Sequence, residues 1–138
     1  MSGFGIVYVG GGVIDKVREL PYPHFSKFTK PYVKGRMIDV SASAAAFTDS
    51  YSLPFDAEFL SIAFASSIYC VGDYWELTIG TDKVCEQIYT KELPESVSMG
   101  NSFGIVFPLA AGTSIKFQFF NVSGEAKQVW YNVKFLRK

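Results

Sequence analysis

The chain contains one histidine, the side chain that most often acts as a general acid or base near neutral pH. His24 lies between Pro23 and Phe25, and no acid or nucleophile stands around it at the spacing of a catalytic motif. Pairs of glutamates for glycoside hydrolysis occur in any β protein of this size and identify no site without geometry. The sequence therefore predicts no catalytic residue, and we expect the protein not to be an enzyme.

Two cysteines, Cys70 and Cys85, lack the C-x-x-C spacing of a zinc or redox site. Buried free thiols are the simplest interpretation, and a disulfide between neighbouring strands stays open. Carboxylates in predicted loops could converge on Ca²⁺, although solvated loop acids are the more common case; these residues are Asp49, Asp56, Asp73 and Asp82. We expect no metal and no cofactor.

Exposed aromatic side chains are the remaining candidates for binding chemistry. Trp75, Trp130 and Tyr74 could form a platform on which a sugar ring stacks, because Trp and Tyr offer a large rigid surface with a polar group at one end. The same side chains could instead form a subunit interface or pack in the core. A glycan is therefore an alternative ligand.

Net charge and composition limit the classes of partner that the protein is expected to bind. The 138 residues include thirteen basic and thirteen acidic side chains, so the formal net charge is zero and nothing attracts a phosphate backbone or an anionic bilayer. We expect neither a nucleic acid nor a membrane partner. Hydrophobic residues make up 49% and aromatic residues 17%, which with zero net charge favours self-association. We predict a homo-oligomer.

The first 35 residues predict an extended N-terminal arm. A Gly10-Gly11-Gly12 break follows a short β-like run, and prolines at 21, 23 and 31 disfavour regular structure. The arm is rich in aromatic side chains, so we expect it to dock on its own domain or on a neighbour; the candidate docking residues are Phe4, Tyr8, Tyr22, Phe25, Phe28 and Tyr32.

Residues 36–138 predict an all-β domain, because short alternating segments are separated by turn residues and helical periodicity is nearly absent. Leu60, Ile62 and Phe64 mark one face of one segment, and Trp75, Leu77 and Ile79 mark one side of another. Residues 108–112 resemble a hairpin turn between two apolar runs. About eight strands predict an antiparallel sandwich or jelly roll. The expected strands span 37–42, 47–53, 58–65, 73–80, 83–90, 104–107, 113–122 and 128–136.

Two stretches resemble small virion proteins of phages and prophages of Gram-positive bacteria. One runs from Gly72-Asp73-Tyr74-Trp75 to Glu92-Leu93-Pro94, and the other includes Pro108-Leu109-Ala110-Ala111-Gly112 and Val129-Trp130-Tyr131-Asn132. The resemblance covers roughly residues 50–138 and implies a β-sandwich building block of the tail, baseplate, collar or capsid-decoration class. Some similar prophage proteins have been linked to host lysis, which keeps a lytic accessory role open.

The expected function is therefore that of a virion structural protein, docking through its arm and sandwich surfaces onto copies of itself and other virion proteins. The alternative is a carbohydrate- or receptor-binding sandwich. The first nine residues lack the basic and apolar regions of a signal peptide, and no segment has the roughly 18 apolar residues of a membrane span. We expect synthesis in the host cytoplasm and a final location in the virion.

Overall fold

Strands supply all the regular structure of the described residues, which in this computed structural model are 7–9, 12–14, 26–91, 96–98 and 107–138. Within those ranges no helix is long and apolar enough to cross a membrane. The strands are β1 Val7–Val9, β2 Gly12–Ile14, β3 Lys30–Val40, β4 Ala46–Ser52, β5 Ala57–Ser66, β6 Tyr74–Ile79, β7 Asp82–Tyr89, β8 Ser96–Ser98, β9 Phe107–Leu109, β10 Ser114–Phe120 and β11 Lys127–Arg137.

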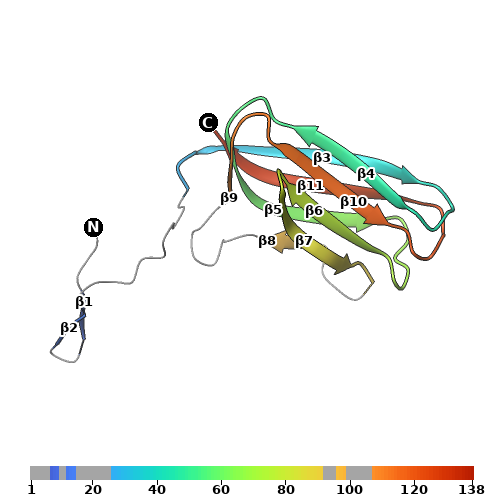
Figure 1. The fold of residues 1–138 in the computed structure, drawn as a ribbon, viewed down its shortest axis with the longest axis horizontal. Helices are drawn as coiled ribbons and strands as arrows, with labels where there is room; N and C mark the ends of the chain where they lie inside the picture. The colour runs from blue at the N-terminus through green and yellow to red at the C-terminus, as the bar shows by residue number, and fades with distance from the viewer. Residues whose placement is uncertain (1–6, 10–11, 15–25, 92–95, 99–106) are drawn as a thin grey trace.

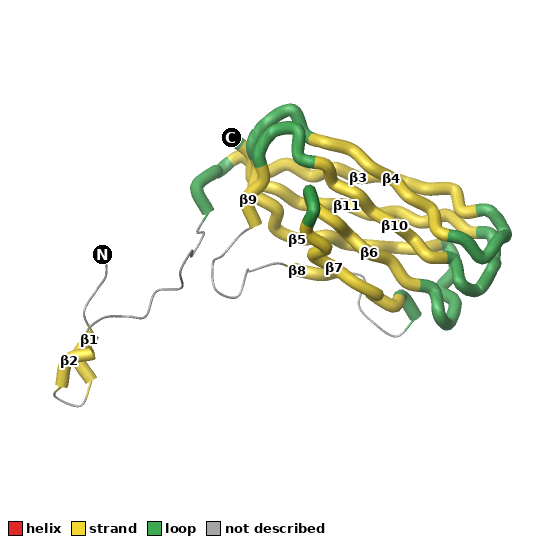
Figure 2. The backbone as a smooth tube through the Cα atoms, in the orientation of Figure 1, coloured by secondary structure: helices red, strands yellow, loops and turns green. Residues whose placement is uncertain are grey.

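Two antiparallel sheets pack face to face, as Figures 1 and 2 show. The first sheet, named here the β10 sheet, has the order β4-β10-β6-β7. The second, the β11 sheet, has the order β3-β11-β5-β8, and β9 also pairs with β5. The prediction of an all-β antiparallel sandwich is confirmed.

The core lies between the sheets and follows the two-residue alternation of the central strands. In β10 the buried positions are Ile115, Phe117 and Phe119, as predicted. In β11 every second residue is buried in the same way. Across the core, the Phe117 and Tyr131 rings stack with centroids 4.1 Å apart. The buried apolar residues of β11 are Val129, Tyr131, Val133 and Phe135.

Strand β3 begins at Lys30, which moves the start of the sandwich from the predicted residue 36 to residue 30. All eleven residues of β3 pair with β11, including Pro31 opposite Leu136. The prolines of this region predicted irregular structure, but β3 is the edge of its sheet, where a residue without an N–H is tolerated. Residues 30–35 thus belong to the sheet and not to the arm.

Strand β5 contains an irregularity that the alternation did not reveal. Ser61 pairs with Lys134 whereas Phe59 pairs with Phe135, so Leu60 is the extra residue of a β-bulge. Phe59 and Ile62 are fully buried and Leu60 is only half-buried. The prediction that Leu60 shares one face with Ile62 and Phe64 is wrong, because the bulge shifts the alternation.

Residues 108–112 do not form the predicted hairpin. They connect β9, which pairs with β5 in the β11 sheet, to β10 in the opposite sheet. The Gly112 N–H donates to the Leu53 carbonyl at 2.8 Å, and Gly112 has a φ of 85°. This turn therefore crosses from one sheet to the other. The residue composition of the turn does not distinguish such a crossing from a hairpin.

Near the N-terminus, β1 pairs antiparallel with β2, with Val7 opposite Ile14. Most of the predicted arm, including His24, lies outside the described residues.

Candidate assembly surface

The outer face of the β11 sheet carries exposed apolar side chains on three adjacent strands. Trp130 of β11 pairs with Met37 of β3 on one side and with Ala65 of β5 on the other. Val33 is 55% exposed, Met37 53% and Trp130 37%. We call the group Val33, Met37, Ala65 and Trp130 the outer apolar face.

Polar side chains lie on the same strand faces, both between Val33 and Met37 and beyond Met37. Asn132 lies opposite Gly35, where an added Cβ would stand 2.6 Å from the Asn132 Oδ1 atom, so glycine makes room for the amide. The Gln128 Nε2 atom donates to the Asp39 Oδ1 atom at 3.0 Å. The face therefore combines apolar and polar side chains, as most protein interfaces do.

The outer face of the β10 sheet differs in composition. Phe120, Tyr74 and Tyr89 form one row across three strands, with ring centroids 4.5 Å apart for Tyr74 and Phe120 and 5.5 Å for Tyr74 and Tyr89. Tyr74 is half-buried and one of its ring faces stacks on Phe120, so it offers less free surface to a ligand than the sequence predicted.

Beyond this row, the β10 sheet carries a buried acid that orders the next strand. The Glu76 Oε1 atom accepts from the Lys83 Nζ atom at 2.8 Å, and Oε2 accepts from the Gln87 N–H at 3.3 Å. Gln87 has a positive φ of 51°, at an irregular part of the β6–β7 pairing. The hydrogen bond that Lys83 donates to Glu76 raises the pKa of Lys83. Glu76 is thus structural.

Trp75 belongs to the core. Its exposure is 1%, and its ring packs on Phe64 at 6.0 Å and on Phe117 at 5.6 Å between centroids. No ring face is open to solvent, so the structure removes Trp75 from the ligand-stacking candidates and leaves Trp130 as the exposed tryptophan. Trp75 points into the core because alternate residues of β6 face inward.

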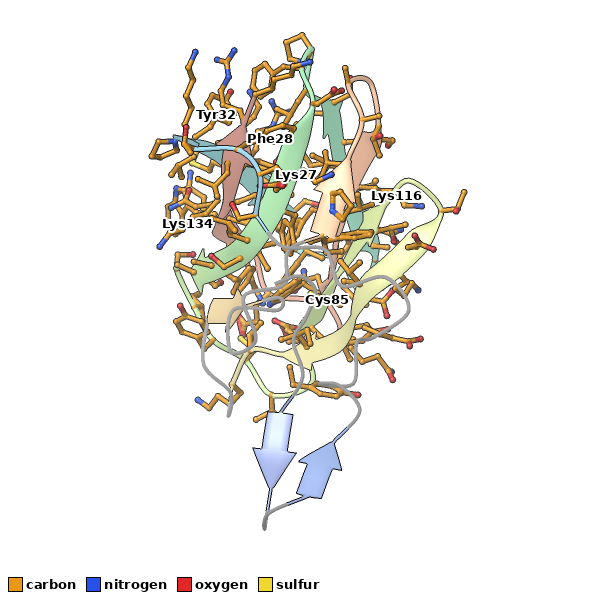
Figure 3. The ribbon with its side chains drawn as sticks, turned by 90° about the vertical axis from the view of Figure 1, so that its left-hand side faces the viewer. Lys27, Phe28, Tyr32, Cys85, Lys116 and Lys134 are labelled. Atoms are coloured by element: carbon orange, nitrogen blue, oxygen red, sulfur yellow. The ribbon has the colours of Figure 1, made fainter. Side chains whose placement is uncertain are left out.

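The segment just before β3 is anchored by a buried carboxylate. Glu58, 1% exposed, accepts the Lys27 N–H at 2.9 Å, the Phe28 N–H at 3.2 Å and the Ser26 hydroxyl at 3.1 Å. Figure 3 shows Lys27 and Phe28 beside β5, the strand that carries Glu58. We call residues 26–28 with Glu58 the arm root, because it fixes where the preceding chain leaves the sandwich.

Tyr32, one of the six predicted docking residues, packs within its own sandwich. Its ring contacts Phe55 at 5.3 Å and Phe135 at 6.1 Å between centroids. Phe28 is half-buried and lines a hollow of about 270 Å³ with Pro108 and Leu109. Tyr8 lies in β1, and the other three predicted docking residues lie outside the described residues: Phe4, Tyr22 and Phe25.

Comparison with known proteins places the sandwich in a family. Residues 28–138 match the family described as Domain of unknown function (DUF8551). The chain belongs to this family. The match begins at Phe28, inside the arm root, and extends to the last residue of the chain. The DUF8551 domain therefore includes β3 through β11.

No curated protein matches the chain. Among solved structures, the sandwich is similar to a chain of the crystal structure of infectious bursal disease virus VP2 subviral particle. The sequence identity is 11% and the TM-score 0.33, and the likeness covers 80% of this chain and 38% of that chain.

Three of the four acids considered as calcium ligands, namely Asp49, Asp56 and Asp73, accept hydrogen bonds from protein groups in the DUF8551 domain. Asp49 accepts two hydrogen bonds from the Arg36 guanidinium, at 2.8 and 2.9 Å, and one from the Tyr131 hydroxyl at 2.8 Å. The Arg36 hydrogen bonds hold the pKa of Asp49 below its usual range. Asp56 accepts the Ala111 N–H. Within the described ranges, no three His, Cys, Asp or Glu side chains are grouped as a metal site.

Both cysteines of the DUF8551 domain are free thiols. Cys85 is buried, and burial raises the pKa of its thiol to about 11. Cys70 is half-buried. A high thiol pKa keeps Cys85 protonated and unreactive at neutral pH.

Sequence reasoning missed two features of these surfaces and one sequence motif. Val33 fell inside the predicted arm, and the alternation of residues 32–40 would have placed it with Met37 on one face. The anchoring role of Glu58 had no local signal. The segment Gly100-Asn101-Ser102-Phe103-Gly104 has the G-x-S-x-G spacing of a nucleophile turn, although that motif joins a strand to a helix in α/β-hydrolases. It falls outside the described residues of an all-β fold.

A second exposed apolar group lies on loops at the end of the sandwich away from the arm root. Val71 is 73% exposed and Val122 55%. The two loops touch, because a Cβ added at Gly72 would lie 3.5 Å from a Val122 methyl group. These side chains provide a matched control for the outer apolar face.

Proposed function

We propose that this DUF8551 protein is a non-enzymatic assembly subunit of a phage virion, which docks onto copies of itself and other virion proteins through the outer apolar face and the N-terminal arm. The virion class rests on the resemblance of the segments within residues 50–138 to small virion proteins of Gram-positive phages. The physical case rests on the surfaces described above. A place in the tail, baseplate, collar or capsid decoration is compatible with both.

The observation that carries the proposal is the outer apolar face. Apolar side chains that gather on an exposed sheet face are typical of interaction sites. Trp and Met are enriched at interface centres, and Trp is the residue that most often dominates binding energy. Trp130 and Met37 lie side by side here as a cross-strand pair.

The charged side chains support a structural role. Arg36 pairs with Asp49, Lys83 with Glu76, and Lys127 with Asp73, so these groups stabilise the sandwich instead of lining an open cleft. The arm root adds a fixed exit point for the chain that precedes it, which suits a subunit whose terminal segment reaches a neighbour. A net charge of zero removes the repulsion that keeps subunits apart.

The proposal is tested by purifying particles from a host that encodes the chain. On a density gradient, the protein should co-sediment with particles in many copies, measured by quantitative mass spectrometry with a soluble host protein as the control. The double variant with Met37→Ser and Trp130→Ser should be incorporated at least several-fold less. Recovery of the chain only in the particle-free fraction would contradict a virion role.

A glycan-binding function is the second candidate, favoured by the exposed Trp130 ring with Gln128 and Asn132 before and after it on the same strand face. Aromatic rings flanked by amides are a common way to hold a sugar. Because Trp75 is buried, a ligand-induced change in tryptophan fluorescence would report on Trp130. Saturable quenching by cell-wall polysaccharide that is absent from Trp130→Ser would favour this function over assembly.

A further inference from the structure

A buried lysine and a buried aspartate join the two sheets at the end of the sandwich away from the arm root. Asp73 immediately precedes β6 of the β10 sheet, and Lys127 is the first residue of β11. Their side chains are 1% and 0% exposed, and the Lys127 Nζ atom donates to the Asp73 Oδ2 atom. The proposed assembly role uses this pair only as an ion pair that stabilises the sandwich.

Ser123 contacts both partners of the pair. Its N–H donates to the Asp73 Oδ1 atom at 2.9 Å, and its hydroxyl donates to Oδ2 at 3.1 Å. The same hydroxyl accepts from the Lys127 Nζ atom at 3.0 Å. The Phe119 ring lies 5.7 Å from Nζ. One carboxylate oxygen thus faces a fixed backbone donor, while the other faces both the amine and a hydroxyl.

Amide formation needs the amine and the carboxylic acid, because an ammonium group has no lone pair with which to attack a carboxyl carbon. One proton transfer along the Nζ to Oδ2 hydrogen bond converts ammonium and carboxylate into amine and carboxylic acid. An amine held against a carboxylic acid in a fixed geometry has lost the entropy that normally opposes amide formation.

We propose that Lys127 and Asp73 condense into an intramolecular amide bond between Nζ and Cγ. The Nζ lone pair attacks the Asp73 Cγ atom, and the negative charge that develops on Oδ1 is stabilised by the Ser123 N–H. A proton passes from Nζ through the Ser123 hydroxyl to Oδ2, the Cγ–Oδ2 bond breaks, and water leaves. Amine and acid give amide and water, so no oxidant or co-reactant is needed. Ser123 is exposed, which opens a path to solvent for the water.

The product would tie the β10 sheet covalently to the β11 sheet. A cross-link between residues distant in sequence restricts the unfolded chain and makes complete separation of the sheets impossible without breaking a covalent bond. The inference is independent of the proposed function, since the bond forms within one chain.

Intact mass spectrometry of the denatured full-length chain tests the proposal. The expected mass is lower by one water molecule than that of the unlinked sequence. Trypsin should then fail to cleave after Lys127 and should release one species that joins the peptide carrying Asp73 to the peptide carrying Lys127. A full mass, or a dehydrated mass without joined peptides, would overturn the proposal.

Two variants separate the cross-link from other losses of water. Lys127→Arg keeps the cation but cannot form this amide, so its mass should equal that of the unlinked variant chain. Ser123→Ala keeps the backbone donor and removes the hydroxyl relay, so a measurable unlinked fraction should persist in freshly made protein. A dehydrated Lys127→Arg chain would assign the lost water to another site and contradict the proposal.

Discussion

Glu58 and Asp73 are both buried carboxylates, but they lie at opposite ends of the sandwich and hold different things together. Glu58 accepts two backbone N–H groups of the segment before β3. Asp73 accepts from Lys127 across the two sheets. The first therefore fixes a chain segment to one sheet, and the second fixes one sheet to the other. We expect loss of Asp73 contacts to weaken the whole domain and loss of Glu58 contacts to loosen the arm root.

The largest effect should come from Lys127→Met. Removal of Lys127 leaves the buried Asp73 carboxylate without its cation, which costs about 3–5 kcal/mol of unfolding free energy, and it also removes the proposed amide cross-link. Urea unfolding followed by circular dichroism measures the change, and Lys134→Met, at an exposed position of the same strand, is the control. Equal stability of the two variants would show that the Asp73 end does not hold the sheets together.

Glu58→Gln should have a smaller and more local effect. The amide retains one acceptor oxygen but loses the charge that strengthens the bonds from residues 26–28, at about 1–3 kcal/mol. Trypsin should cut after Lys27 faster than in the parent chain, while Glu86→Gln, at an exposed site, should leave the rate unchanged. An unchanged rate of cleavage after Lys27 in Glu58→Gln would contradict the anchoring role of Glu58.

The Arg36–Asp49 pair, which joins β3 to β4, predicts that the stability of the domain depends on pH. Because the folded-state pKa of Asp49 is lowered, its contribution is present above the unfolded value of about 3.9 and is lost as the pH falls through the folded value. Both groups are partly exposed, so the effect is on the order of 1 kcal/mol. Asp49→Asn should be less stable than the parent chain at neutral pH and should lose less stability on acidification. Thermal unfolding at neutral and at acidic pH measures both differences. Parallel pH profiles would contradict this assignment.

The smallest effect concerns the thiols. Cys85, with a pKa raised to about 11 by burial, should react slowly with iodoacetamide in the folded protein, whereas the half-buried Cys70 should react faster. Peptide mass spectrometry after brief labelling distinguishes the two sites. If Cys70→Ser leaves the fast labelling in place, the burial of Cys85 does not control its reactivity.

Alternation in the central strands was sufficient to predict the sandwich and its core, since Phe117, Phe119 and Tyr131 follow it without interruption. It failed at Leu60, because a bulge is set by the partner strand, and at residues 30–35, because the sequence does not show that β3 is an edge strand that tolerates Pro31. Trp130 was predicted as an exposed aromatic residue. Its neighbours on the outer apolar face come from strands far apart in the sequence, so their proximity depended on sheet order.

Light scattering of the full chain over a range of concentrations tests the assembly claim most directly. The account predicts a molar mass that is a multiple of the single chain and that falls toward the single-chain value in Trp130→Ser. The control Val122→Ser, which removes an exposed apolar side chain from the loop before β11 and not from the outer apolar face, should assemble like the parent. A single-chain mass at every concentration, or an assembly unaffected by Trp130→Ser, would contradict it.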